Sequence, residues 1–195
     1  MKNRLVLILA LFSAASIFAS QKTTWGVQRV LINAIVGERA AIARYEAFAV
    51  KADAEGYLGV ADLFRAAAKA ERVHLDRFTS VANERGLALP ASDSRPPIVG
   101  STRENLDTAI RAELAERDDV YLDAFKTSTR DADEGVAKVF DQTRDAEVEH
   151  ANLCQNAARN LDAMKEHKAY YVCPVCGYTT DVHLPMCPSC RHSMR

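Results

Sequence analysis

The chain has 195 residues, enough for one domain of about 150 residues and a small appendage. Hydrophobic residues make up 48% of it and charged residues 26%, which is ordinary for a soluble globular protein. The formal net charge of −1 excludes the strongly basic balance of a nucleic-acid-binding protein, so no nucleic-acid partner is expected.

The N-terminal segment has the composition of an export signal. Lys2 and Arg4 precede an uncharged apolar run over residues 5–20, which is shorter than the roughly 20 residues of a membrane-spanning helix. Small residues such as Ala19 and Ser20 lie at its end and offer cleavage points. We therefore predict a signal peptide over residues 1–20 and a periplasmic or otherwise exported protein, with an uncleaved membrane anchor as the alternative.

Four helices are predicted after this segment. Apolar residues recur at helical spacing over residues 24–54, 57–85 and 102–130, and from about 135 to about 165. Gly56 and Gly86 are stop signals for the first two helices. Short turns join the helices within each pair, whereas residues 87–101 form a proline-containing loop long enough to run the length of a helix. This pattern predicts an all-α, ferritin-like four-helix bundle over residues 21–166.

Each predicted hairpin carries one copy of a Glu-x-x-His motif, in which both side chains share a helix face. Further glutamates interrupt the apolar faces of the first and third helices, and burying bare carboxylates is prohibitive unless they are paired or bind metal. For any single glutamate, a place on the exposed face of an amphipathic helix is the alternative. The full set fits a two-metal site inside a bundle, and its oxygen and nitrogen ligands suit iron or manganese better than zinc or calcium. The predicted ligands, which we also predict to be catalytic, are Glu38, Glu71, His74, Glu113, Glu116, Glu147 and His150.

The C-terminal segment, residues 167–195, contains two Cys-x-x-Cys pairs. They are Cys173 with Cys176 and Cys187 with Cys190, and this spacing is a strong signal for a tetrahedral four-sulfur metal site. So small a domain folds poorly without metal. Structural zinc, redox iron and, after export, two disulfides are the three interpretations that the cysteines allow. The fifth cysteine, Cys154, is predicted to be a buried thiol.

The motifs together resemble the rubrerythrin family. The resemblance lies in Gly37-Glu38, Arg44-Tyr45, Ala70-Glu71 with His74, Ala112-Glu113-Leu114-Ala115-Glu116, Tyr121, and Glu147 with His150. Cys-Pro-x-Cys-Gly over residues 173–177 resembles rubredoxin, a domain that rubrerythrins carry at this end, although Arg191 stands where free rubredoxins have glycine. Tyr45 and Tyr121 are predicted to donate hydrogen bonds to ligand carboxylates, with ordinary core tyrosines as the alternative.

The resemblance implies two non-haem irons in the bundle and one iron in the four-cysteine site, where zinc is also possible. Glu71 and Glu147 would bridge the two irons, while His74 and Glu116 would alternate as ligands of one of them. The implied activity is a peroxidase that reduces hydrogen peroxide to water in oxidative-stress defence. A ferroxidase or iron-handling protein is one alternative, and a structural protein stabilised by zinc is another.

The implied electron donor is a second protein. If the chain is exported, we expect a cytochrome or another periplasmic or membrane-linked carrier. About 22 Å of predicted helix separates His150 from Lys165, so the four-cysteine site would be far from its own bundle site unless the domain folds back. A head-to-tail homodimer, as rubrerythrins form, would place each small domain beside the partner's site.

Overall fold

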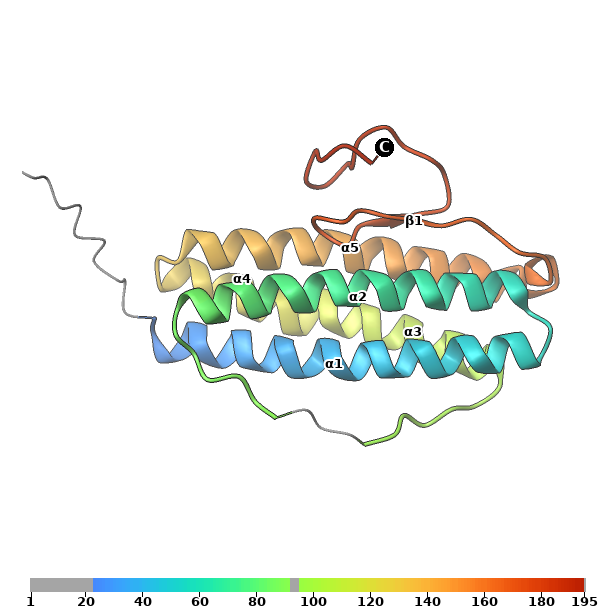
Figure 1. Cartoon of the computed structure of the whole chain (residues 1–195), viewed down its shortest axis with the longest axis horizontal. Helices are drawn as coiled ribbons and strands as arrows, with labels where there is room; N and C mark the ends of the chain where they lie inside the picture. The colour runs from blue at the N-terminus through green and yellow to red at the C-terminus, as the bar shows by residue number, and fades with distance from the viewer. Residues whose placement is uncertain (1–22, 92–94, 195) are drawn as a thin grey trace, which may run out of the picture.

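The computed structural model describes residues 23–91 and 95–194, so the predicted signal peptide over residues 1–20 lies outside the described part. Within it, four helical rods lie side by side as a bundle (Figure 1). Three are single helices: α1 (Trp25–Ala54), α2 (Leu58–Glu84) and α5 (Glu134–Arg159). The remaining rod joins α3 (Thr102–Ala115), the π-helix η1 (Glu116–Val120) and α4 (Tyr121–Arg130). The bundle is the one that the apolar spacing predicts.

The helix ends follow local signals in the sequence. Gly56 and Gly86 adopt φ angles of 80° and 66°, a region where glycine ends helices without strain. Ser101 and Glu104 form a capping box at the start of α3. The predicted end of the last helix near residue 165 is wrong. The helix ends at Arg159, because Asn160 leaves the helical region at φ −121°, and a 3-10 turn, η2 (Leu161–Met164), follows.

The connection between α2 and α3 is the long crossover of the ferritin-like arrangement. Its described parts, residues 85–91 and 95–101, pass along the outside of α1 from one end of the bundle to the other (Figure 1). Arg39 Nη1 on α1 donates a 2.7 Å hydrogen bond to the carbonyl oxygen of Pro90 and so ties the crossover to the bundle.

The bundle core consists of two apolar clusters. One contains Tyr45, Phe48 and Phe64, and the other contains Phe78, Tyr121 and Phe140. The clusters reflect the internal repeat: Tyr45 lies 5.9 Å from Phe64 between ring centroids, and Tyr121 lies 5.8 Å from Phe140. The buried glutamates and histidines belong to neither cluster.

The π-helix changes which side chains of the third rod face the core. A regular α-helix would turn Val120 inward, but its side chain is 44% exposed while Tyr121 is 1% exposed. A π turn closes i to i+5 hydrogen bonds and so accommodates one extra residue. The extra residue shifts the phase of the apolar stripe, so that Tyr121 and Ala124 enter the core after Glu116.

The small C-terminal domain folds back over α2 and α5 rather than continuing along the bundle axis (Figure 1). It contains the antiparallel strands β1 (Tyr171–Val172) and β2 (Thr179–Thr180), with Tyr171 paired to Thr180. Asp62 on α2 fixes the linker, since its Oδ2 accepts a 2.8 Å bond from His167 Nδ1 and a 3.1 Å bond from Lys168 N. None of the helices in the described residues is both long and apolar enough to cross a membrane.

Candidate metal centres

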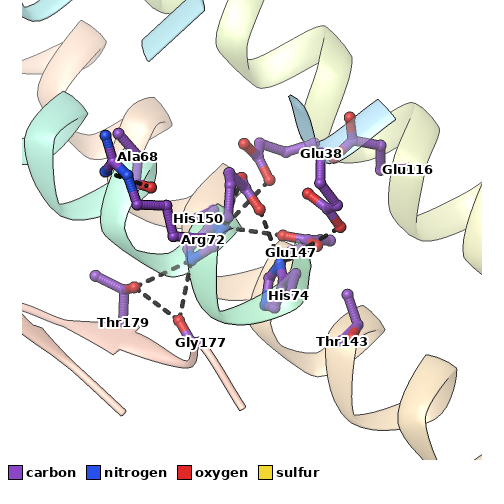
Figure 2. A network of polar contacts seen from close by, with 12 residues as sticks. Glu38, Ala68, Arg72, His74, Glu116, Thr143, Glu147, His150, Gly177 and Thr179 are labelled. Carbon is purple, nitrogen blue, oxygen red and sulfur yellow. Dashed lines mark hydrogen bonds and ion pairs between the residues drawn. The ribbon is translucent and has the colours of Figure 1, made fainter. Parts of the chain in front are cut away.

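Six of the predicted bundle ligands meet in one buried place, and each helical rod contributes at least one of them (Figure 2). They form two overlapping groups whose ligand atoms lie within 4.8 Å of one another. The first group is Glu38, Glu71, His74 and Glu147, and the second is Glu71, Glu113, Glu147 and His150. Because Glu71 and Glu147 belong to both groups, they lie where bridging carboxylates must.

The two histidines present the same nitrogen to the carboxylates. His74 Nδ1 lies 2.7 Å from Glu71 Oε2 and 3.3 Å from Glu147 Oε1. His150 Nδ1 lies 2.9 Å from Glu147 Oε2 and 3.4 Å from Glu113 Oε2. The ring nitrogens that remain, both Nε2, point away from the carboxylates, so Nδ1 is the atom available to a metal.

The C-terminal domain holds both Nε2 atoms. His74 Nε2 lies 3.0 Å from the carbonyl oxygen of Cys176. His150 Nε2 lies 3.0 Å from Thr179 Oγ1 and 3.4 Å from the carbonyl oxygen of Gly177 (Figure 2). A backbone carbonyl accepts only, so Nε2 of His74 donates to it, and in the neutral ring Nδ1 is then the nitrogen whose lone pair can bind a metal. The small domain therefore fixes the ring that faces the carboxylates.

The cluster fits two cations because its polar atoms are unpaired. Glu38, Glu71, Glu113 and Glu147 are fully buried, and buried carboxylate oxygens without partners are costly. Two cations bound by these carboxylate oxygens and by the histidine nitrogens would give the buried oxygens the partners that they lack. Among the predicted ligands, the buried atoms that make no hydrogen bond within the described residues are Glu38 Oε2, Glu71 Oε1, Glu113 Oε2, Glu116 Oε2, both oxygens of Glu147, and His150 Nδ1.

Electrostatics supports the same conclusion. Burial, followed by repulsion from Glu71, raises the pKa of Glu38 and of Glu147 well above the usual value of a glutamate. Burial alone would lower the pKa of His150, but Glu113 and Glu71 raise it to about 9. Protons and cations therefore compete for this cluster.

Two tyrosines hold the ligand carboxylates. Tyr45 donates a hydrogen bond to Glu113 Oε1, and Tyr121 donates one to Glu38 Oε1. Burial, then the charge of the neighbouring carboxylate, raises the pKa of each phenol well above its usual value, so both remain protonated donors. Each tyrosine comes from a different half of the repeat than the glutamate it holds.

Glu116 lies at the edge of the site rather than in either group (Figure 2). Its side chain is 16% exposed, and its Oε1 lies 3.8 Å from Arg44 Nη2 on α1. Glu116 is the first residue of the π-helix, so it starts the segment whose phase differs from that of the α-helix before it. His74, its predicted alternative, occupies the group of Glu38, Glu71 and Glu147.

The four C-terminal cysteines form the third ligand group. Their sulfurs lie within 4.8 Å of one another, with 3.5 Å between Cys173 and Cys190 and 3.5 Å between Cys176 and Cys187. These separations are far longer than a disulfide bond, so the disulfide alternative is not adopted. The turns of the two Cys-x-x-Cys pairs have the same backbone hydrogen bond: Gly177 N donates to Cys173 O, and Arg191 N donates to Cys187 O. Arg191 takes the glycine-like φ of 65° at the position where free rubredoxins have glycine.

Cys154, the remaining cysteine, is 1% exposed in the apolar cluster of Tyr45, as predicted. Burial raises the pKa of its thiol well above the usual value. It is therefore an uncharged core residue.

A bundle with one long crossover, Glu-x-x-His on two helices and a glutamate from each other rod defines a ferritin-like di-iron carboxylate protein. The family model described as Rubrerythrin matches residues 29–158. The chain belongs to the rubrerythrin family. Its metal centres are accordingly a di-iron carboxylate site and a rubredoxin-like four-cysteine site.

Similar proteins span both parts of the chain. It is 31% identical to Rubrerythrin-1 of Clostridium acetobutylicum over 172 residues, which cover 83% of this chain and 88% of the relative. It is 30% identical to nigerythrin of Nitratidesulfovibrio vulgaris, covering 80% of this chain and 78% of that protein. A solved structure of fully reduced, all-ferrous nigerythrin superposes with a TM-score of 0.82 at 27% identity, covering 100% of this chain and 97% of the other.

Some features of the site are not predicted from the sequence. Nothing local indicates that the Cys176 carbonyl and Thr179 would bind the histidines, since these contacts join residues about 30 to 100 positions apart. The π-helix does leave a signal. Glu38 and Tyr45 are separated by one residue fewer than their repeat counterparts, Glu113 and Tyr121.

Proposed function

We propose that the protein is a peroxidase that reduces hydrogen peroxide to water with electrons delivered through the four-cysteine site. Peroxide, two electrons and two protons yield two waters. The observation that carries the proposal is the direct contact between the two centres, in which the Cys176 carbonyl meets His74 at 3.0 Å. A protein that only stores iron has no need of an electron-transfer site held against its ligands.

The roles of the residues follow from their contacts. Glu38, Glu71, Glu113, Glu147 and both histidines would hold the two irons. Two ferrous ions held there would supply both electrons for cleavage of the O–O bond, and an iron in the four-cysteine site would return these electrons one at a time. Tyr45 and Tyr121 orient Glu113 and Glu38. Burial keeps bulk water from the carboxylates, which strengthens their interaction with the cations.

Glu116 and His74 would serve as alternative ligands. A carboxylate anion balances an oxidised, more positive centre, whereas a neutral imidazole suits the reduced one. Glu116, at the start of the π-helix and 3.8 Å from Arg44, is adjacent to the cluster without belonging to it. The exchange would keep the buried charge nearly constant through a two-electron cycle.

The function is tested by mixing anaerobically reduced protein with peroxide or with oxygen. We expect rapid oxidation by peroxide, one peroxide consumed per two electrons, and reoxidation of the four-cysteine iron. Preferential reaction with oxygen and accumulation of ferric iron would instead indicate a ferroxidase. A colourless four-cysteine site that binds only zinc would indicate the structural alternative, because ferric thiolate is coloured and zinc thiolate is not.

Glu116→Ala is expected to retain bundle iron but to react slowly with peroxide. The six residues of the two ligand groups remain, while the oxidised centre loses its anionic partner. We expect oxidation to slow by about tenfold or more, the scale of changes near a metal site. Stopped-flow mixing measures the rate, and Glu46→Ala, which removes an exposed glutamate of α1, is the control. A rate equal to that of the control would refute the exchange.

The electron route is proposed to run within one chain, from the four-cysteine site through Cys176 and His74. The 22 Å of predicted helix between His150 and Lys165 does not keep the two sites apart, because the small domain folds back and places the Cys176 carbonyl 3.0 Å from His74. A head-to-tail homodimer stays a prediction. Mixing Cys176→Ala chains with Glu71→Ala chains tests the route: transfer within a chain predicts no recovery of turnover. Recovery in verified heterodimers would show that electrons cross between subunits.

We also propose that the chain is exported and receives electrons from a periplasmic or membrane-linked carrier such as a cytochrome. The basis is the basic and then apolar segment over residues 1–20, with small residues at its end. The mature protein is expected to lack these residues and to fractionate with the periplasm or its equivalent. Intact-mass measurement of protein from the native host tests this, and a cytosolic protein retaining Met1 would contradict it.

A further inference from the structure

Arg77 lies at the junction of the two metal centres, and no carboxylate of the described residues forms a hydrogen bond or ion pair with it. It follows His74 by one turn of α2. Its Nη2 donates a 2.6 Å hydrogen bond to Oε1 of Gln142 on α5, a neutral amide. Its Nη1 is buried and makes no hydrogen bond with any residue in the described ranges. A guanidinium in such a place needs a negative group to compensate its charge.

The small domain packs over the Arg77–Gln142 pair, because Cys176 contacts His74, one turn before Arg77, and Ser189 contacts Asp145, one turn after Gln142. Burial lowers the pKa of Arg77, while negative charge on Cys176, Cys190 and Cys173 raises it, and no carboxylate acts on it comparably. Contacts on both sides hold the domain there. His74 Nε2 binds the Cys176 carbonyl at 3.0 Å, and Ser189 Oγ donates a 2.9 Å bond to Asp145 on α5.

The internal repeat indicates that this charge is specific to one half of the bundle. Leu153 occupies the position equivalent to Arg77, since it follows His150 as Arg77 follows His74. Leu153 is buried in an apolar cluster. At this repeat position, therefore, the cation belongs to the copy whose histidine contacts Cys176, and the other copy has leucine.

We propose that Arg77 sets the reduction potential of the four-cysteine iron by stabilising its reduced form. Four thiolates with ferric iron carry a net charge of −1. One electron from an external one-electron carrier protein brings the charge to −2, with no bond made or broken. A fixed cation nearby stabilises the doubly negative reduced form more than the singly negative oxidised form, so it favours reduction. This rests on the electron-transfer role proposed above for the four-cysteine site.

The test is a mediated redox titration of the iron-loaded full chain, followed by the absorption of the ferric thiolate. Arg77→Met removes the charge with similar bulk, and Arg77→Lys retains it. We expect Arg77→Met to lower the equilibrium constant for reduction by roughly tenfold, which is 59 mV for one electron. Arg77→Lys should restore most of the potential. Arg72→Gln, which removes an exposed charge from the same helix, should leave it unchanged.

An unchanged potential in Arg77→Met, with normal helicity and iron content, would overturn the proposal. If that variant does not retain iron in its four-cysteine site, Gln142→Glu replaces it as the test. Its carboxylate would lie beside the guanidinium and compensate the charge, so the potential should again fall, and an unchanged value would overturn the proposal equally. Failure of the wild type to reduce peroxide would count against the proposed function alone, because the potential is measured without peroxide.

Discussion

Glu71→Ala is expected to abolish iron binding in the bundle while leaving the four-cysteine iron in place. Glu71 belongs to both bundle ligand groups, so its loss removes a ligand from each cation at once. It also leaves His74 Nδ1 without its 2.7 Å partner. The wild type is expected to hold three irons per chain, one for each ligand group. The variant should hold one, as measured by metal analysis after anaerobic reconstitution, and Glu147→Ala should behave in the same way.

The matched control is Glu84→Ala, which removes an exposed glutamate from the same helix. It should retain all three irons. The visible spectrum of the ferric thiolate reports separately on the four-cysteine site, whose ligands lie outside the bundle. Two irons retained in the bundle of Glu71→Ala would mean that Glu71 does not bridge them.

The second large effect is expected from Gly177→Ala, which should separate the two metal centres. A Cβ atom at this position would lie 2.2 Å from His74 Nε2, which is far inside van der Waals contact. The φ of 79° adds backbone strain for any L side chain. The small domain must therefore move off the histidines, and electron transfer to the bundle should slow by at least about tenfold. Stopped-flow reoxidation of the four-cysteine iron after addition of peroxide measures the transfer.

Gly86→Ala is the control that distinguishes the steric clash with His74 from the backbone strain of a positive φ. Gly86 has a similar φ of 66°, but no atom of the described residues lies within 4 Å of a Cβ built there. It should lose some stability and keep its transfer rate. Thr179→Val offers a second test that leaves the cysteine turns intact, since it removes the hydroxyl 3.0 Å from His150 Nε2. Transfer at the wild-type rate in both Gly177→Ala and Thr179→Val would show that these contacts do not carry the route.

The sequence by itself determined the bundle and the ligand groups. Helical periodicity is a local property, so apolar spacing was enough to place the four rods and the faces on which Glu38, Glu71 and Glu147 lie. The internal repeat and the two Cys-x-x-Cys pairs could also be recognised from the sequence, because the spacing of ligands on a helix or a turn is fixed by a few neighbouring residues. Helix ends at Gly56 and Gly86 follow for the same reason.

Only the tertiary structure decided how these parts meet. The contact of the Cys176 carbonyl with His74 depends on a domain folding back over α2 and α5, which no local pattern encodes. The phase of the third rod after Glu116 depends on a π turn, because a shift by one residue alters which side chains a helix buries. The pairing of Arg77 with the neutral amide of Gln142, and with no carboxylate in the described part of the chain, likewise emerges only when α2, α5 and the small domain are assembled. Contacts between distant segments depend on the complementarity of whole surfaces, whereas periodicity and spacing report only on neighbours along the chain.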